Sequence, residues 1–202
     1  MQIPQDVIDR LNAPSYRRAS TLPKFRCTIF DPRWNSFVES WAPRIYRFVE
    51  QALGPYGTTV DGVIEEIDCG SYMAGANASF DLDSGKIKLS LPLEGNSGRT
   101  LEKMCHEMVH ASLAKFPQND PFYDEGFVDF TVFILGHADI WHPYDMLGAA
   151  AENIETRKKR AMLDQSDYDR KRWAGGLFAS VSRGPWIVET LKMRKAEGNY
   201  QW

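Results

Sequence analysis

Hydrophobic residues recur every three or four positions between Trp34 and Leu53, and Gly54-Pro55 follows the last of them. This spacing places apolar side chains on one face of an α-helix, and a Gly-Pro pair is a typical helix end. The segment is therefore predicted to form an amphipathic helix, which Pro43 would bend.

A different period follows in the sequence KIKLSL, residues 86–91. Its apolar and polar residues alternate, which predicts a half-buried strand with one face toward water. Asp83-Ser84-Gly85 separates this run from the sequence ASFDL, so a β-hairpin is predicted here. Residues 60–67 are rich in Val and Ile and indicate a further strand.

Helical spacing returns in the second half of the chain. Helices are predicted over residues 99–115, 124–135, 144–163, 168–181 and 185–196. Residues 1–33 are rich in Pro, Arg and Ser and show little periodicity, which predicts an irregular N-terminal arm. The expected architecture is α+β: one domain over residues 34–202, with a small antiparallel sheet packed on the helix of 99–115 and a helical, basic C-terminal region from 144.

The chemistry begins in that helix, at the sequence CHEMVH. The chain has four histidines, and two of them, His106 and His110, lie one helical turn apart on the same face. Two imidazoles at this spacing can bind one zinc ion without distortion. Glu107 lies about 100° around the helix from His106, where it can act as a general base without binding the metal.

The alternative is a chance pair of histidines in an ordinary helix. Apolar residues flank the motif on two sides of the helix, so the segment is predicted to be largely buried. Buried imidazoles and a buried carboxylate are costly unless a partner satisfies them. The sequence therefore favours a zinc site.

A catalytic zinc site needs a third protein ligand and leaves the fourth position to water. Glu125, in the sequence YDEGFVDF, is the first candidate, because the intervening residues suffice for the chain to return alongside the helix. Asp129, four residues later, is placed to accept a hydrogen bond from a ligating imidazole. His137 and His142 are the alternative ligands, although their neighbours indicate a loop.

The side chain that stabilises the oxyanion is left open by the sequence. Tyr123, Tyr144, His137 and His142 are the candidates, since each can donate a hydrogen bond to an oxygen that becomes negative during hydrolysis.

Composition and charge argue against a secreted, membrane-spanning or strongly nucleic-acid-binding protein. The net charge is −3, and no stretch resembles a signal peptide or is apolar over the length that a membrane span requires. Three scattered cysteines without a C-x-x-C pair fit a reducing, intracellular compartment, cytoplasmic or nuclear. Residues 156–202 carry eleven Lys and Arg against five Asp and Glu, which favours a solvated helix face over a nucleic-acid surface.

The runs IKLSLPL and TLEKMCHEMVHASL resemble the SprT-like zinc metallopeptidases, the family that includes the Spartan DNA–protein crosslink proteases. The resemblance implies a zincin-like fold, with His106 and His110 as metal ligands and Glu107 as general base. Glu125-Gly126 falls where the family has the His-Gly of its third ligand, and Asp129 replaces the family's Phe. A Glu there gives the ligand set of the gluzincins, and DEGFVDF is similar to the N-E-G-F-A-x-Y segment of gluzincin aminopeptidases.

The function expected from these features is a zinc-dependent metallopeptidase that acts on a peptide or protein, with the KIKLSL strand as an edge that pairs with the substrate backbone. One alternative is a zinc hydrolase or lyase for a small molecule. Another is a non-catalytic module that zinc stabilises and whose basic C-terminal region binds nucleic acid or another partner.

Overall fold

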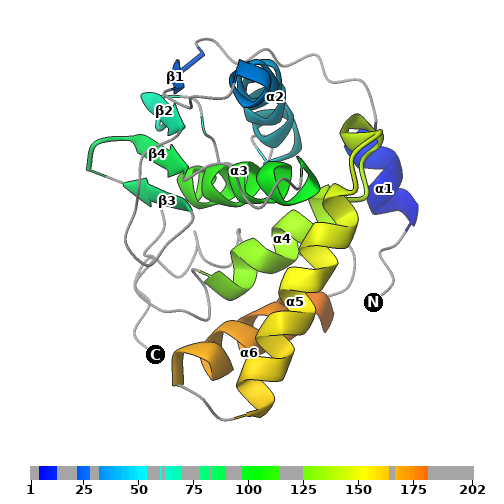
Figure 1. Ribbon diagram of the computed structural model, residues 1–202. Coiled ribbons are helices and arrows are strands. Elements are labelled where there is room, and N and C mark those ends of the chain that lie inside the picture. The colour runs from blue at the N-terminus through cyan, green and yellow to red at the C-terminus, as the bar shows by residue number, and fades with distance from the viewer. Residues whose placement is uncertain are drawn as a thin grey trace. The chain divides into compact units, whose positions relative to one another are not determined.

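The computed structural model describes ten segments of the chain: residues 5–12, 22–27, 32–53, 60, 62–69, 78–81, 83–89, 97–113, 125–163 and 167–181 (Figure 1). The chain divides into two compact units. One comprises residues 15–114, and the other comprises residues 1–14 together with 115–202.

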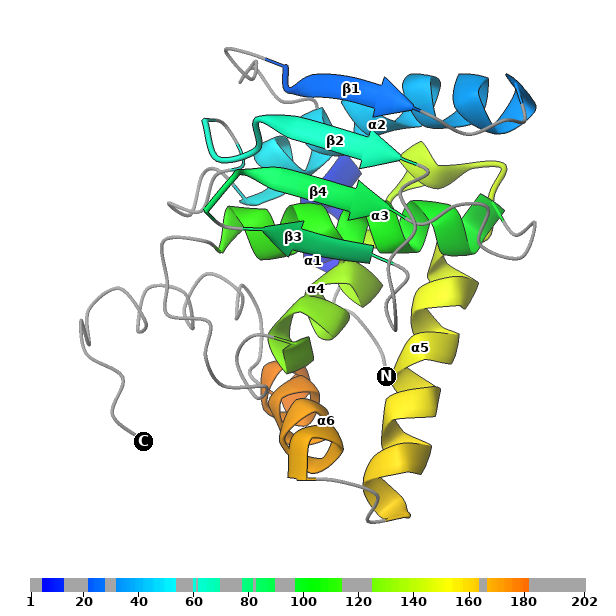
Figure 2. The same ribbon diagram turned by 60° about the vertical axis from the view of Figure 1, so that its left-hand side comes forward.

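A four-stranded mixed sheet forms one layer of the unit of residues 15–114. Its strands lie in the order β1 (Lys24–Cys27), β2 (Glu66–Cys69), β4 (Lys86–Leu89) and β3 (Ala78–Asp81), as Figure 2 shows. The β1–β2 and β2–β4 pairs are parallel, and the β3–β4 pair is antiparallel. The α+β class is confirmed, but the prediction of an antiparallel sheet was wrong, because a helix connects β1 to β2 and returns the chain to the end where β1 began.

Strand β4 has the predicted half-buried character. Ile87 and Leu89 are fully buried, whereas Lys86 and Lys88 are only partly buried. The strand is not an edge, however, because β2 pairs with one side of it and β3 with the other. The expectation that this strand pairs with a substrate was therefore wrong. Strand β3, which lies next to β4, is the outermost described strand at that edge of the sheet, and β1 is the outermost at the opposite edge.

Helices α2 (Pro32–Leu53) and α3 (Ser97–Ser112) cover one face of the sheet and pack against each other (Figures 1 and 2). The apolar face of α2 is buried there, including Ala42, Ile45 and Val49. Pro43 lies inside α2 without ending it. Helix α3 packs against both α2 and the sheet, and most of its residues are buried, including His106, Glu107 and His110.

The second unit consists of helices α1 (Gln5–Asn12), α4 (Phe127–Leu135), α5 (Met146–Met162) and α6 (Asp167–Val181), with the short 3-10 helix η3 (Asp139–Trp141). Every residue of α4 is buried, and α5 and α6 both pack on it. Asn12 links α1 to η3, since its Oδ1 accepts a hydrogen bond from the backbone N–H of Asp139 at 3.0 Å.

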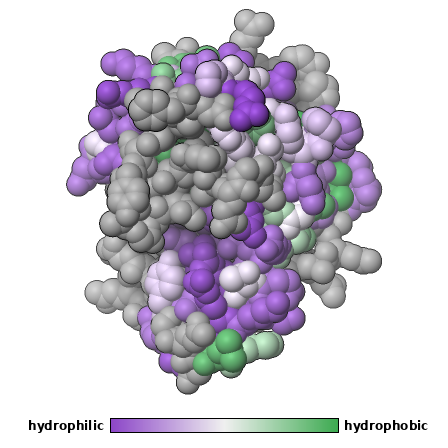
Figure 3. All heavy atoms as spheres, in the orientation of Figure 1, coloured by the Kyte–Doolittle hydropathy of each residue, from purple (hydrophilic) through white to green (hydrophobic). Residues whose placement is uncertain are grey.

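The part of this unit that Figure 3 colours is mostly polar on the face shown. Hydrophilic side chains predominate over α5 and α6 in Figure 3, and a small hydrophobic patch marks the end of α5, where Met162 and Leu163 are exposed. None of the described helices combines the length and apolar composition that a membrane span needs.

Sequence and structure agree on the longer helices to within a few residues. The helices predicted over 34–53, 99–115, 124–135, 144–163 and 168–181 correspond to α2, α3, α4, α5 and α6. Helix α1 and strand β1 were missed, because both lie in the arm that was expected to be irregular. The helix predicted over 185–196 lies outside the described residues.

Gly85, in the turn between β3 and β4, should tolerate a side chain less well than Gly62. Gly85 has φ +61°, and a Cβ there would lie 2.7 Å from the carbonyl oxygen of Val63. Gly62 has a similar φ of +73° but nothing within 4 Å of such a Cβ. Gly62→Ala should cost only the conformational penalty of about 1–2 kcal/mol. Gly85→Ala should cost at least about 1 kcal/mol more, because the backbone must also move.

Urea unfolding of the two variants beside the wild type measures this difference. Equal losses in the free energy of unfolding would contradict the close approach at Gly85.

Candidate metal centre

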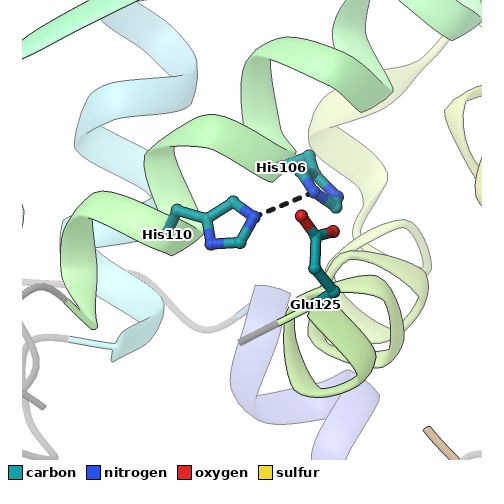
Figure 4. A group of neighbouring side chains, drawn as sticks. All are labelled: His106, His110 and Glu125. Atoms are coloured by element: carbon teal, nitrogen blue, oxygen red, sulfur yellow. Dashed lines mark hydrogen bonds between the residues drawn. The ribbon is translucent and has the colours of Figure 1, made fainter. Parts of the chain in front are cut away.

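Helix α3 presents the side chains of His106 and His110 on one face, as the sequence predicts (Figure 4). Their Nε2 atoms lie 3.1 Å apart, and the ring planes make an angle of 69°. Two nitrogens bound at about 2.05 Å to one tetrahedral ion are separated by about 3.3 Å. The separation therefore suits a shared metal ion. It also suits a hydrogen bond between one protonated and one unprotonated ring nitrogen.

The environment of the pair is apolar and shielded from water. His106 is 4% exposed, His110 is 8% exposed and Glu107 is 6% exposed. Cys105 is buried as well, and burial, followed by the charge of Glu102, raises the pKa of its thiol, so the thiol stays protonated. Polar groups at this depth are costly without partners, and a metal ion would satisfy both imidazoles at once.

Glu125 belongs to the other unit, where it lies just before α4 and is partly buried. His106, His110 and Glu125 form a group of side chains that could hold a metal ion (Figure 4). The group offers two imidazole nitrogens and a carboxylate oxygen, a donor set that suits Zn²⁺ and other divalent ions of the first transition row.

The alternative ligands have other surroundings. His137 donates from Nδ1 to the carbonyl oxygen of Phe133 at 3.0 Å, and its ring packs edge-on against Phe133. His142 is exposed at the end of η3. Among the described residues, the candidate metal group includes neither of them.

Two of the oxyanion candidates are tyrosines. Tyr144 is partly buried just before α5. Tyr123 lies outside the described residues. An oxyanion role for Tyr144, His137 or His142 stays a prediction.

Asp129 has well-defined partners within its own unit. Its Oδ2 accepts a hydrogen bond from Nε of Arg172 at 2.6 Å, and its Oδ1 accepts one from Nη2 of Arg172 at 2.7 Å. Asn153 donates to the same Oδ1 at 2.9 Å. Asp129 is therefore a buried anchor for an arginine of α6. The role toward a ligating imidazole stays a prediction.

Arg172 is the residue of this region that the sequence analysis missed. It is 5% exposed, and its Nη1 lies 2.7 Å from Oε2 of Glu125 and 3.1 Å from the hydroxyl of Tyr168. A signal for it existed, since a carboxylate such as Asp129 in the apolar helix FVDFTVFIL requires a cation. Nothing local in the sequence selects Arg172 from the basic C-terminal region.

The cluster keeps Arg172 charged. Burial by itself lowers the pKa of Arg172, but its hydrogen bonds to Asp129 and the charges of Asp129 and Glu125 outweigh that effect and raise the pKa. Burial, followed by the charge of Arg172, lowers the pKa of Arg157, whose Nε lies 4.0 Å from Asp129. Burial and then the charge of Glu125 raise the pKa of Tyr168, so its hydroxyl stays protonated.

A pocket beside this cluster has room for about one water molecule, roughly 10 Å³, which is too small for a substrate. Its lining residues are Gly126, Asp129, Phe130, Ile154, Arg157, Arg172 and Trp173.

Loss of the anchor should destabilise this unit strongly. Asp129→Ala leaves Arg172 buried without its two-pronged partner, so we expect a loss of about 3–5 kcal/mol in the free energy of unfolding. Asp167→Ala is the matched control, because Asp167 is 70% exposed and pairs with Arg170 and Lys171 only at 3.8 and 3.6 Å. The control should lose less than about 1 kcal/mol. Similar losses in thermal or urea unfolding would contradict the account of the buried anchor.

No protein-family model matches this chain, and no curated protein or solved structure matches it significantly. Conclusions about its activity therefore rest on the chemistry of its own residues.

Proposed function

We propose that this chain is a zinc-dependent metallopeptidase, with His106, His110 and Glu125 as the metal ligands. The observation that carries the proposal is the 3.1 Å separation of the two Nε2 atoms on a buried helix. The separation is close to that of two ligands on one tetrahedral ion. The sequence H-E-x-x-H, and the resemblance of its surroundings to SprT-like metallopeptidases, support zinc over other ions.

In this proposal Glu125 is the third ligand. Three protein ligands would leave one coordination position to water, as in catalytic zinc sites, whereas structural sites are closed by four protein ligands. The presence of two histidines and one carboxylate in a single candidate group supports this arrangement.

Glu107 is the proposed general base. Zinc held by these ligands would supply Lewis-acid chemistry, which acidifies water and polarises a carbonyl. The Glu107 carboxylate would accept a proton from the attacking water and transfer it to the nitrogen of the departing amine. Its buried position next to His106 on α3 supports this role, because a shielded carboxylate exchanges protons with the substrate in preference to bulk water.

A peptide is the proposed substrate. Strand β3 pairs with β4 on one side, it is one of the two outermost described strands, and it packs against α3. An extended peptide could therefore add to the sheet next to the helix that carries the histidines. A zincin-like arrangement of sheet and H-E-x-x-H helix is part of the same proposal.

The basic C-terminal region gives less support to a nucleic-acid partner. Arg172 makes buried contacts with Asp129 and Glu125, and Arg157 lies beside the same cluster. These two cations contribute to internal charge balance, which reduces the number left for a phosphate backbone.

Metal analysis tests the ligand set. We expect purified wild type to carry about one zinc ion per chain, and His106→Ala and Glu125→Ala to lose most of it, because removal of one of three ligands sharply weakens binding. His142→Ala is the control and should retain zinc, since His142 is exposed. A metal-free wild type, or loss of zinc only on substitution of His142, would show that the proposed ligand set is wrong.

The role of Glu107 is tested by Glu107→Gln, which keeps the shape of the side chain and removes the base. We expect zinc content to be unchanged and peptide cleavage to fall by about 10²–10⁴-fold, measured with an unstructured protein substrate. Glu102→Gln makes the same change at another buried position of α3 and should retain most of the activity. Cleavage by Glu107→Gln at the wild-type rate would exclude Glu107 as the base.

A further inference from the structure

We propose that Arg172 is a positioning residue for the metal centre: it holds Oε2 of Glu125 and leaves Oε1 to bind the metal, so that Glu125 ligates through a single oxygen. This inference rests on the proposed function, since it takes Glu125 to be a ligand. It adds a residue of α6 to a site that the sequence motif confines to α3 and the start of α4.

Asp129 fixes the orientation of the Arg172 guanidinium. Nε and Nη2 of Arg172 each donate to a different oxygen of Asp129, at 2.6 and 2.7 Å. Such a two-pronged contact determines both the position and the plane of the group. Nη1 is thereby directed away from Asp129, and it lies 2.7 Å from Oε2 of Glu125.

Asp129 is itself held in place by its surroundings. Asp129 is 5% exposed on the fully buried helix α4, and Asn153 of α5 donates to its Oδ1 at 2.9 Å. The hydroxyl of Tyr168, one turn before Arg172 on α6, accepts from Nη1 at 3.1 Å. Three helices of one unit therefore fix the group that contacts Glu125.

Asp129 also balances the charge of Arg172. An arginine that faced Glu125 alone would neutralise this carboxylate and weaken its attraction for a cation. Asp129 supplies a negative charge that offsets Arg172, with both groups buried at about 5% exposure. Glu125 can then keep its own negative charge for the metal. Mutation of a residue that hydrogen-bonds to a metal ligand typically weakens metal affinity by about 10–100-fold.

The test is a double-mutant cycle on the full chain. Zinc affinity is measured by competition with a chromophoric chelator for wild type, Arg172→Met, Glu125→Ala and the double variant. We expect Arg172→Met to weaken zinc binding by about 10–100-fold. The same substitution should have no further effect in the Glu125→Ala background, where only the two histidines bind. A purely structural role would lower affinity in both backgrounds.

Two further variants separate positioning from folding. Arg170→Met, on the same helix but with a side chain 49% exposed, should bind zinc like the wild type. The double variant Asp129→Asn/Arg172→Met removes both buried charges, so no unpaired carboxylate is left to destabilise the fold. It should lose as much zinc affinity as Arg172→Met alone.

The visible spectrum of the cobalt-substituted protein gives an independent signature. Release of Oε2 in Arg172→Met allows Glu125 to bind through both oxygens, so the d–d bands should weaken as the coordination number rises.

The outcomes are distinguishable. A wild type that binds no zinc would overturn the metal centre and this inference with it. A wild type that binds zinc, together with Arg172→Met of unchanged affinity and cobalt spectrum, would overturn the role of Arg172 alone. An equal loss of affinity with and without Glu125 would also overturn it.

Discussion

The central constraint is the placement of two imidazoles one turn apart on a helix that is largely buried. Helix α3 packs against α2 and against strands β3 and β4, which holds its backbone in place, and the side chains of His106 and His110 are both buried. Their Nε2 atoms are held 3.1 Å apart, and this fixed separation makes the pair suited to a metal ion. The helix is thus a rigid support for the chemistry, and the sheet and α2 provide that rigidity.

Much of the fold is predictable because it depends on local periodicity. The 3.6-residue repeat located α2, α3, α5 and α6, and alternation with a Gly-containing turn located the β3–β4 hairpin. Strand order is not a local property. Strand β1 is only four residues long, KFRC, and its parallel pairing with β2 depends on the crossover through α2. The parallel pairing of β2 with β4 depends on β3, which lies between them in the chain but at the edge of the sheet. No pattern within residues 22–27 indicates that they join the sheet.

The candidate site likewise has a part that depends on local sequence and a part that depends on long-range packing. A spacing of four residues on one helix sets the relation of His106 to His110, so the sequence suffices to predict it. Arg172 is separated from Asp129 by 43 positions, and its contact depends on how α4, α5 and α6 pack. The sequence predicts that the buried carboxylate of Asp129 pairs with a cation, but it does not identify the residue. The packing of α4, α5 and α6 determines that this residue is Arg172.

The most direct test of the central claim is a crystal structure of the protein grown with zinc, with anomalous diffraction measured at the zinc edge. The account predicts one strong peak about 2.0–2.2 Å from Nε2 of His106, Nε2 of His110 and one carboxylate oxygen of Glu125, with water in the remaining position. The absence of a peak, with the two rings hydrogen-bonded to each other, would contradict the account. A peak bound by four protein side chains would contradict its catalytic part.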